Sequence, residues 1–218
     1  EFAIGFGKII WQKQGKETKY TLRMIPLGGF NNLLGEEEGS NEEGSFSKAS
    51  ISKRLAIVIA GATVNILFGI IVYFILVSTV GIQFADPTRD TIVNRLYYGA
   101  KGTGNFILSI FDSIKILFTG GLSTDQMVGI VGISEVVVQT NGILNYIYLL
   151  AVISVSLGVT NLLPIPALDG GKIVILLIEL IRRKPMKAET EAKIQLIGLS
   201  ILITLSILVT YNDIVRIF

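Results

Sequence analysis

The residues of this chain most able to do chemistry lie where a long apolar stretch is interrupted. Residues 161–171 read NLLPIPALDGG, and the segments on both sides are strongly apolar. Pro164 and Pro166 lack a backbone donor, and glycine disfavours helix, so the sequence predicts a break in a helix here. Unwound backbone at membrane depth is tolerated only where protein or a water-filled cavity surrounds it. The break therefore predicts a functional site, shaped by Pro164, Pro166 and Gly170.

Asp169 is an ionisable residue within this break, at or near membrane depth. A carboxylate in such a place is energetically costly, and it usually faces the interior of the helix bundle and works there. Asn161 lies eight residues earlier, on the preceding helix. Two simpler interpretations stay open. Asp169 caps a helix that starts at Gly170, because Asp is a favoured N-cap residue. Asn161 makes an interhelical hydrogen bond, as polar residues in membrane helices commonly do.

Long uncharged segments must position these residues. Half of the 218 residues are hydrophobic, and the mean hydropathy is +0.63. No Asp, Glu, Lys or Arg occurs in residues 55–85, 136–168 or 194–212. A helix needs about 20 apolar residues to cross the hydrocarbon core of a bilayer. We therefore predict an α-helical polytopic membrane protein with three transmembrane segments, at about 55–80, from about 143 to the break, and at about 194–211.

The basic residues orient these segments in the membrane. Residues 1–54 carry eight Lys or Arg, residues 182–193 carry five, and the longer stretch 86–135 carries only four. Cytoplasmic loops are enriched in Lys and Arg, so residues 1–54 and 182–193 are predicted to be cytoplasmic and 86–135 external.

Outside the spans, the sequence predicts a small β element and an amphipathic helix. Residues 8–25 form two extended runs around Gly15, and in the second run Tyr20, Leu22 and Met24 alternate with other residues at the period of a strand. We predict a membrane-associated β-hairpin in residues 1–34, on the cytoplasmic side, that ends at Pro26 before a Gly28–Gly29 turn. Residues 35–54 form an acidic loop rich in Gly and Ser. Residues 55–218 form the transmembrane core, with an external amphipathic segment at about 90–118 whose apolar residues are Phe106, Ile107, Ile110, Phe111, Ile114 and Leu117.

Several motifs together resemble one family. NLLPIPALDGGK at 161–172 resembles the Asn-x-x-Pro-x-x-x-Leu-Asp-Gly signature of site-2-type intramembrane metalloproteases, and in particular of their bacterial regulator-of-sigma-E protease branch. AGATVNILFG at 60–69, which contains Gly61 and Asn65, is similar to that family's Ala-Gly-Pro-x-x-Asn segment, with Ala62 in place of proline. GIVGI at 129–133 resembles Gly-Pro-Val-Gly-Ile, with Ile130 in place of proline. EFAIGFGKIIW and RMIPLGGF look like the family's membrane-reentrant β-hairpin. The resemblance extends over nearly the whole chain.

The resemblance implies a multi-pass enzyme of the bacterial plasma membrane, a zinc endopeptidase acting in regulated intramembrane proteolysis. Two histidines of a His-Glu-x-x-His helix and the aspartate of the Leu-Asp-Gly motif bind Zn²⁺ in that family, and the glutamate activates water. Asp169 would be the third ligand. Asn161 would contact substrate, and the strand containing Tyr20, Leu22 and Met24 would pair with it by β-augmentation. The implied substrates are single-span membrane proteins, such as anti-sigma factors or signal-peptide remnants.

This chain departs from the family in two ways. It contains no histidine, and the family's His-Glu-x-x-His helix lies just before the segment that resembles the start of this chain. We therefore expect an N-terminally truncated chain that has one zinc ligand of three, lacks the catalytic glutamate and is inactive by itself. The branch usually carries a PDZ domain, for which residues 86–135 have no room. Filtering of substrates by such a domain is not expected.

Two other functions remain open at this point. A secondary transporter would also use a discontinuous helix, with Asp169 binding a cation and Asn161 binding substrate. The lack of an inverted repeat disfavours it. A non-catalytic relative would only bind membrane segments. The lipid bilayer is an expected partner in every case, nucleic acid is not, and the absence of cysteine excludes a thiolate metal site.

The distribution of charge leads to a test of topology. Cysteines introduced at Ser40 and Ala188 should react with an impermeant label from the cytoplasmic side, and one introduced at Thr103 from the outside. Reaction of all three from the same side would contradict three spans.

Overall fold

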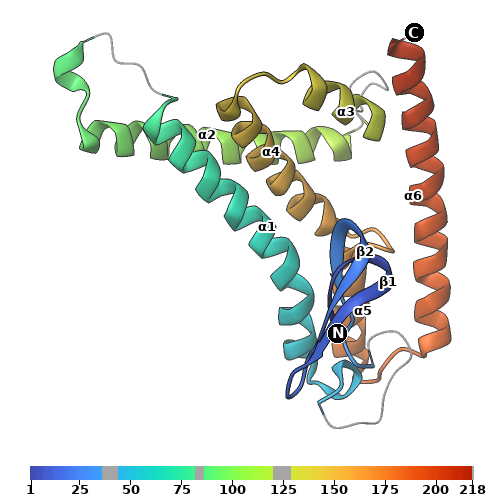
Figure 1. Cartoon of the computed structure of the whole chain (residues 1–218). Coiled ribbons are helices and arrows are strands. Elements are labelled where there is room, and N and C mark those ends of the chain that lie inside the picture. Colours follow the sequence, from blue (N-terminus) through green and yellow to red (C-terminus); the bar gives the residue numbers. More distant parts are fainter. Residues whose placement is uncertain (36–43, 82–85, 120–128, 218) are drawn as a thin grey trace. The chain divides into compact units, whose positions relative to one another are not determined.

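The structure is a computed structural model that describes residues 1–35, 44–81, 86–119 and 129–217 (Figure 1). It consists of two strands, six α-helices and two short 3-10 helices in those ranges. In chain order these are β1 (Phe2–Gln14), β2 (Lys19–Asn31), η1 (Phe46–Lys48), α1 (Ile51–Thr79), η2 (Pro87–Arg89), α2 (Ile92–Thr119), α3 (Ile130–Gln139), α4 (Ile143–Asn161), α5 (Asp169–Arg182) and α6 (Ala188–Ile217). Residues 36–43 of the predicted acidic loop lie outside the described residues, and its last residues, from Ile51, belong to α1.

The three predicted spans are confirmed. Helices α1, α4 and α6 are long and apolar enough to cross a membrane, and few of their residues are buried by the rest of the protein. Apolar side chains that point outward all round a helix are what lipid requires. Helices α1 and α6 begin before the apolar runs, at Ile51 and Ala188. Polar residues can continue a helix beyond an apolar run because Glu, Lys and Arg have favourable helix propensity. The chain is a multi-pass membrane protein.

The chain divides into two compact units, which are described separately. One unit comprises residues 1–57 and 176–192, and the other residues 58–175 and 193–218. In the first unit, β1 and β2 form an antiparallel sheet. The predicted turn at Gly15 is confirmed, and the Gly15 N–H donates to the Thr18 carbonyl at 2.8 Å. The predicted end at Pro26 is wrong, because β2 continues to Asn31.

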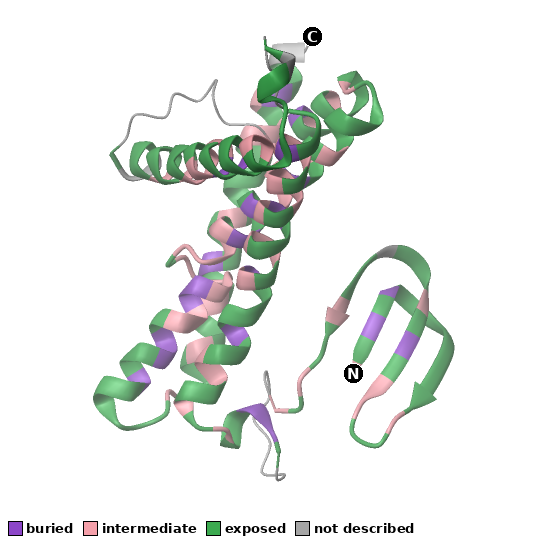
Figure 2. Cartoon of the chain, turned by 90° about the vertical axis from the view of Figure 1, so that its left-hand side faces the viewer, coloured by how far each residue is buried: buried purple, intermediate pink, exposed green. Residues whose placement is uncertain are grey.

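A curl in the hairpin explains why β2 continues. Residues 2–4 lie opposite residues 20–22 and also opposite residues 29–31, so the end of β2 finds partners in the start of β1 (Figure 2). Gly5 and Gly7 have φ values of 84° and 82° in the bend, a conformation that glycine adopts without strain. A Cβ atom at Gly5 would lie 2.5 Å from the Ile25 carbonyl oxygen. Pro26 has no N–H to donate to a neighbouring strand. The strand can continue past it because the pairing of β1 and β2 is irregular in this part of the sheet.

A buried ion pair joins the helical parts of the first unit. The Arg54 guanidinium donates to Glu179 at 2.8 Å, and the Glu179 side chain is only 4% exposed. The other Glu179 carboxylate oxygen accepts from the Met186 N–H at 2.7 Å, and Arg54 lies over the Phe46 ring at 5.1 Å. A buried pair is favourable only when further hydrogen bonds satisfy it, as Met186 does here. The pair fixes the start of α1 to the end of α5.

In the second unit, α1 and α4 pack through glycine. A Cβ atom at Gly158 would lie 2.6 Å from the Ala62 carbonyl oxygen, and one at Gly69 would lie 2.6 Å from that of Ala151. The Ser154 hydroxyl donates to the Asn65 carbonyl at 2.8 Å. Small residues and interhelical hydrogen bonds are the usual basis of helix association in lipid, where burial of apolar surface gives no driving force.

Helix α2 confirms that the predicted amphipathic segment is helical. Its Phe106 ring stacks on Tyr73 of α1, with centroids 4.2 Å apart, so it packs against the bundle. The Leu117 side chain lies outside the described residues. Thr103 is buried and its hydroxyl donates to the Gly99 carbonyl, so Ala100, which is exposed on the same helix, is the better labelling position.

The far end of α6 is fixed to the start of α3. Asp213 of α6 is fully buried, and its Oδ2 accepts from the N–H groups of Gly129 and Gly132, each at 2.9 Å. These donors belong to the first turn of α3 and the residue before it, where N–H groups have no partner within the helix. In the GIVGI motif, the Asp213 side chain of α6 therefore caps the N-terminal end of α3.

The packing of α1 on α4 leads to a test of stability. Gly158→Ala should lower the melting temperature of the protein in detergent, because the new methyl group overlaps the Ala62 carbonyl and such overpacking costs about 1–3 kcal/mol. Gly61→Ala is the matched control on the facing helix, since nothing lies within 4 Å of a Cβ atom there. The control should be neutral or slightly stabilising, because alanine favours helix. Equal melting temperatures for both variants would contradict the close packing at Gly158.

Candidate functional site

The predicted break between two helices is confirmed. Helix α4 ends at Asn161 and α5 begins at Asp169, with Pro164 and Pro166 between them. Tight turns pair much of the backbone between them. The Leu163 N–H donates to the Thr160 carbonyl at 3.1 Å, and the Ile165 N–H donates to the Leu163 carbonyl at 2.7 Å. The Leu168 N–H donates to the Ile165 carbonyl at 3.1 Å. Irregular backbone persists in a membrane protein only when its polar groups are paired in this way.

Asp169 is the first residue of α5. The Leu168 carbonyl accepts from the N–H groups of Gly171 at 3.0 Å and Lys172 at 3.3 Å, which places Leu168 at the N-cap position. The interpretation of Asp169 as the N-cap of a helix starting at Gly170 is therefore wrong. Its side chain is half-buried, and a negative charge in the first turn is favoured by the helix dipole.

Two buried glycines let the start of α5 lie directly against the break. A Cβ atom at Gly170 would overlap the carbonyl oxygens of Leu162 and Leu163, and one at Gly171 would overlap that of Ile165. Backbone oxygens cannot rotate away as side chains do. The residues that follow Asp169 must therefore be glycine for this arrangement to form.

Helix α6 contacts the break at two residues that the sequence analysis did not identify. The Gln195 Oε1 atom accepts from the Ala167 N–H at 2.8 Å. Gly198 lies against Pro166, where a Cβ atom would overlap the proline carbonyl. A signal was present in the sequence: Gln195 is a polar residue just inside an apolar run, with Gly198 one turn further on the same face.

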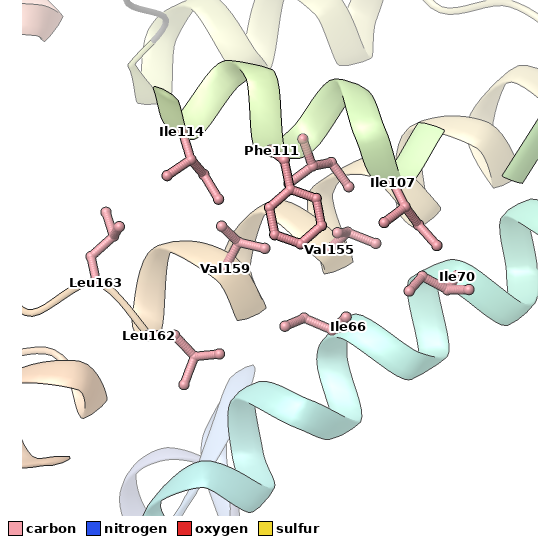
Figure 3. A pocket seen from close by; sticks show the side chains of 10 residues that line it. Ile66, Ile70, Ile107, Phe111, Ile114, Val155, Val159, Leu162 and Leu163 are labelled. Carbon is pink, nitrogen blue, oxygen red and sulfur yellow. The ribbon is translucent and has the colours of Figure 1, made fainter. Parts of the chain in front are cut away.

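An apolar cavity of about 310 Å³ reaches the break (Figure 3). Helices α1, α2 and α4 contribute to its wall, and Leu162 and Leu163 form its end beside the break. The remaining lining side chains are all apolar, namely Ile66, Ile70, Ile107, Ile110, Phe111, Ile114, Val155 and Val159. The cavity can accept hydrocarbon groups and offers almost nothing to a polar ligand.

Of the other predicted site residues, Gly61 and Asn65 lie on α1 in the same unit as the break. Gly61 is exposed, whereas its neighbour Ala62 is fully buried against Gly158. The Asn65 backbone carbonyl accepts the Ser154 hydroxyl of α4, seven residues before the half-buried Asn161.

Tyr20, Leu22 and Met24 lie in the first unit, on the exposed face of β2. Their exposed fractions are 45%, 43% and 59%, whereas the intervening Thr21 is 3% exposed. At Tyr20 and Leu22 the backbone of β2 is not an open edge, because residues 20–22 have partners in both parts of β1. Pairing of a substrate with the backbone of β2 is therefore blocked at these two residues. In the described sheet, residues 9–14 have partners on one side only and form an edge.

The residues present do not by themselves make a catalytic zinc site. The chain has neither histidine nor cysteine. In the described ranges, no three acidic side chains lie close enough together to hold a metal ion. A catalytic zinc ion usually has three protein ligands, of which Asp169 would be one.

Comparison with known proteins gives consistent matches. Residues 1–205 match peptidase family M50. The chain is 42% identical over 135 residues to the zinc metalloprotease RasP of Bacillus licheniformis, and 41% identical over 134 residues to the regulator of sigma-W protease RasP of Bacillus subtilis. Each match covers 61% of this chain and 32% of the relative. The chain thus spans about a third of the length of these relatives.

A putative zinc metalloprotease of Clostridium acetobutylicum matches almost the whole chain. It is 26% identical over 298 residues, which cover 99% of this chain and 88% of the relative. That alignment is longer than the 218 residues of this chain, so the relative has segments without a counterpart here. The family match over nearly the full length, together with the Leu-Asp-Gly segment at a helix break, identifies the chain as a member of peptidase family M50, the site-2-type intramembrane metalloproteases.

Proposed function

We propose that this chain is part of an intramembrane zinc endopeptidase and supplies one of the metal ligands, Asp169. The observation that carries the proposal is the position of this carboxylate. Asp169 begins α5, directly after a break whose backbone is held by turns and by close glycine contacts. Such strict support of an irregular segment is typical of functional sites. The names of the relatives as zinc metalloproteases support zinc as the metal.

The other two ligands and the catalytic glutamate would have to come from residues that are not in this sequence. The family resemblance assigns them to a His-Glu-x-x-His helix. The 218 residues alone are accordingly expected not to cleave peptide bonds, and no chemical step can be assigned to their side chains beyond binding and orientation.

The proposed substrates are membrane proteins with a single span, such as anti-sigma factors or signal-peptide remnants. The relative from Bacillus subtilis is named a regulator of sigma-W protease, which supports an anti-sigma factor. The cavity beside the break supports a substrate with apolar side chains. Asn161, at the end of α4, would hydrogen-bond the unwound substrate backbone, and Gly61, Asn65, Pro164, Pro166 and Gly170 would shape the site around it.

The hairpin would hold the extended part of the substrate. Tyr20, Leu22 and Met24 present apolar surface on one face of β2, suited to substrate side chains. Main-chain pairing would use the edge at residues 9–14 instead, because β-augmentation needs unpaired backbone groups.

Replacement of Asp169 tests the assignment of the ligand. In a protein that also contains the His-Glu-x-x-His helix, Asp169→Asn should lower bound zinc well below one equivalent and abolish cleavage, because the amide lacks the charge of a third ligand. The melting temperature should change little. Asp112→Asn, on the exposed surface of α2, is the control and should leave zinc and cleavage intact.

Metal analysis of the two variants and the wild type separates the alternatives. Stoichiometric zinc in Asp169→Asn would remove Asp169 from the ligand set. A wild-type protein without zinc would favour a transporter or a non-catalytic relative.

Replacement of the exposed residues of β2 tests substrate binding. In the same protein, Leu22→Ser and Met24→Ser should each raise KM about tenfold with zinc content unchanged, since the buried surface of one such side chain contributes about 1.5 kcal/mol or more. Val138→Ser, at a position of α3 that is 80% exposed, is the control. An unchanged KM in both strand variants would mean that this face of β2 has only a structural role.

A further inference from the structure

The turn just before Asp169 contains a residue in an unfavourable conformation. Ala167 has a φ of 74°, in the left-handed region that residues with a Cβ atom rarely adopt. Among the non-glycine residues of the described ranges, only Arg183 shares a positive φ. Such a conformation persists only where the surroundings enforce it.

The backbone donors of the break show what enforces it. Leu163, Ile165 and Leu168 donate to main-chain carbonyls, and the two prolines have no N–H. The remaining donor in residues 163–168 is Ala167, and its partner is the side chain of Gln195 at 2.8 Å. A partly buried N–H in a membrane protein strongly requires an acceptor. The turn therefore depends on a side chain from α6.

Few residues of helix α6 are buried by the rest of the described protein. Among its described residues, only Gly198 and Asp213 are buried. Gly198 lies one turn from Gln195 and contacts Pro166, whereas Asp213 contacts α3 at the opposite end. Most of the side chains between them are exposed. Gln195 and Gly198 thus both connect α6 to the break.

We propose that Gln195 is a positioning residue for Asp169. It holds the left-handed turn at Ala167 through one hydrogen bond and so sets the direction in which α5 begins two residues later. The functional importance of that direction rests on the proposed role of Asp169 as a ligand, but the conformational claim does not. Without the acceptor, Ala167 relaxes to an ordinary φ and the Asp169 side chain moves.

A single cysteine makes this movement measurable, because the chain contains no native cysteine. The 218-residue chain carrying Asp169→Cys in detergent is alkylated with a small maleimide, alone and together with Gln195→Leu. The added substitution should change the rate of alkylation at least fivefold. Adding Ala167→Gly as well should restore the original rate, because glycine adopts the left-handed turn without help. Thr204→Val, on an exposed position of α6, is the matched control and should have no effect.

The outcomes separate this proposal from the proposed function. Equal rates with and without Gln195→Leu would overturn the positioning role. A changed rate that Ala167→Gly does not restore would also overturn it, since the effect would then be a general loss of packing. Circular dichroism establishes whether each variant keeps its helices. In the protein that includes the His-Glu-x-x-His helix, Gln195→Leu should lower kcat at least tenfold, with recovery on adding Ala167→Gly. Wild type without zinc or cleavage would contradict the proposed function and leave the alkylation result standing.

Discussion

The need to pair every backbone polar group away from water governs this protein. Three helices satisfy it within themselves, and the break between α4 and α5 cannot. Between Asn161 and Asp169 the chain uses short turns, two prolines that have no donor, and one side chain from α6. Asp169, the only carboxylate in the break, lies where the regular hydrogen bonding of a helix begins again. The requirement of backbone pairing therefore also determines where a charged group can be held.

Close backbone contacts are the second condition, and glycine provides them. Helices α1 and α4 meet through Gly69 and Gly158, and the start of α5 lies against the break through Gly170. In lipid, apolar side chains gain little from leaving one apolar environment for another, so close packing and hydrogen bonds carry more of the association. The apolar cavity that remains beside Leu162 is formed because helix α2 bridges α1 and α4 with branched and aromatic side chains. The candidate site thus combines closely packed backbone with an apolar wall.

The proposed catalytic function is divided between this chain and residues it does not contain. A member of peptidase family M50 is expected to bind zinc, yet these residues offer one plausible ligand. In the proposed function, their contribution would be orientation, by the break that holds Asp169, the exposed face of β2 and the contact from Gln195. The relative from Clostridium acetobutylicum has segments with no counterpart here.

The sequence by itself determined the spans, the break and the family, because these depend on local composition. Runs without charge, prolines beside glycines and the Leu-Asp-Gly motif are readable without any partner. The contacts were decided only by the tertiary structure. Residues 2–4 at the start of β1 pair with the end of β2, which extends that strand, and also with residues 20–22, which leaves no open edge at Leu22. The capping of α3 by Asp213 and the contact of Gln195 with Ala167 each join residues whose proximity no local pattern encodes. Hydrogen bonds between distant segments are set by packing, which single-sequence patterns do not contain.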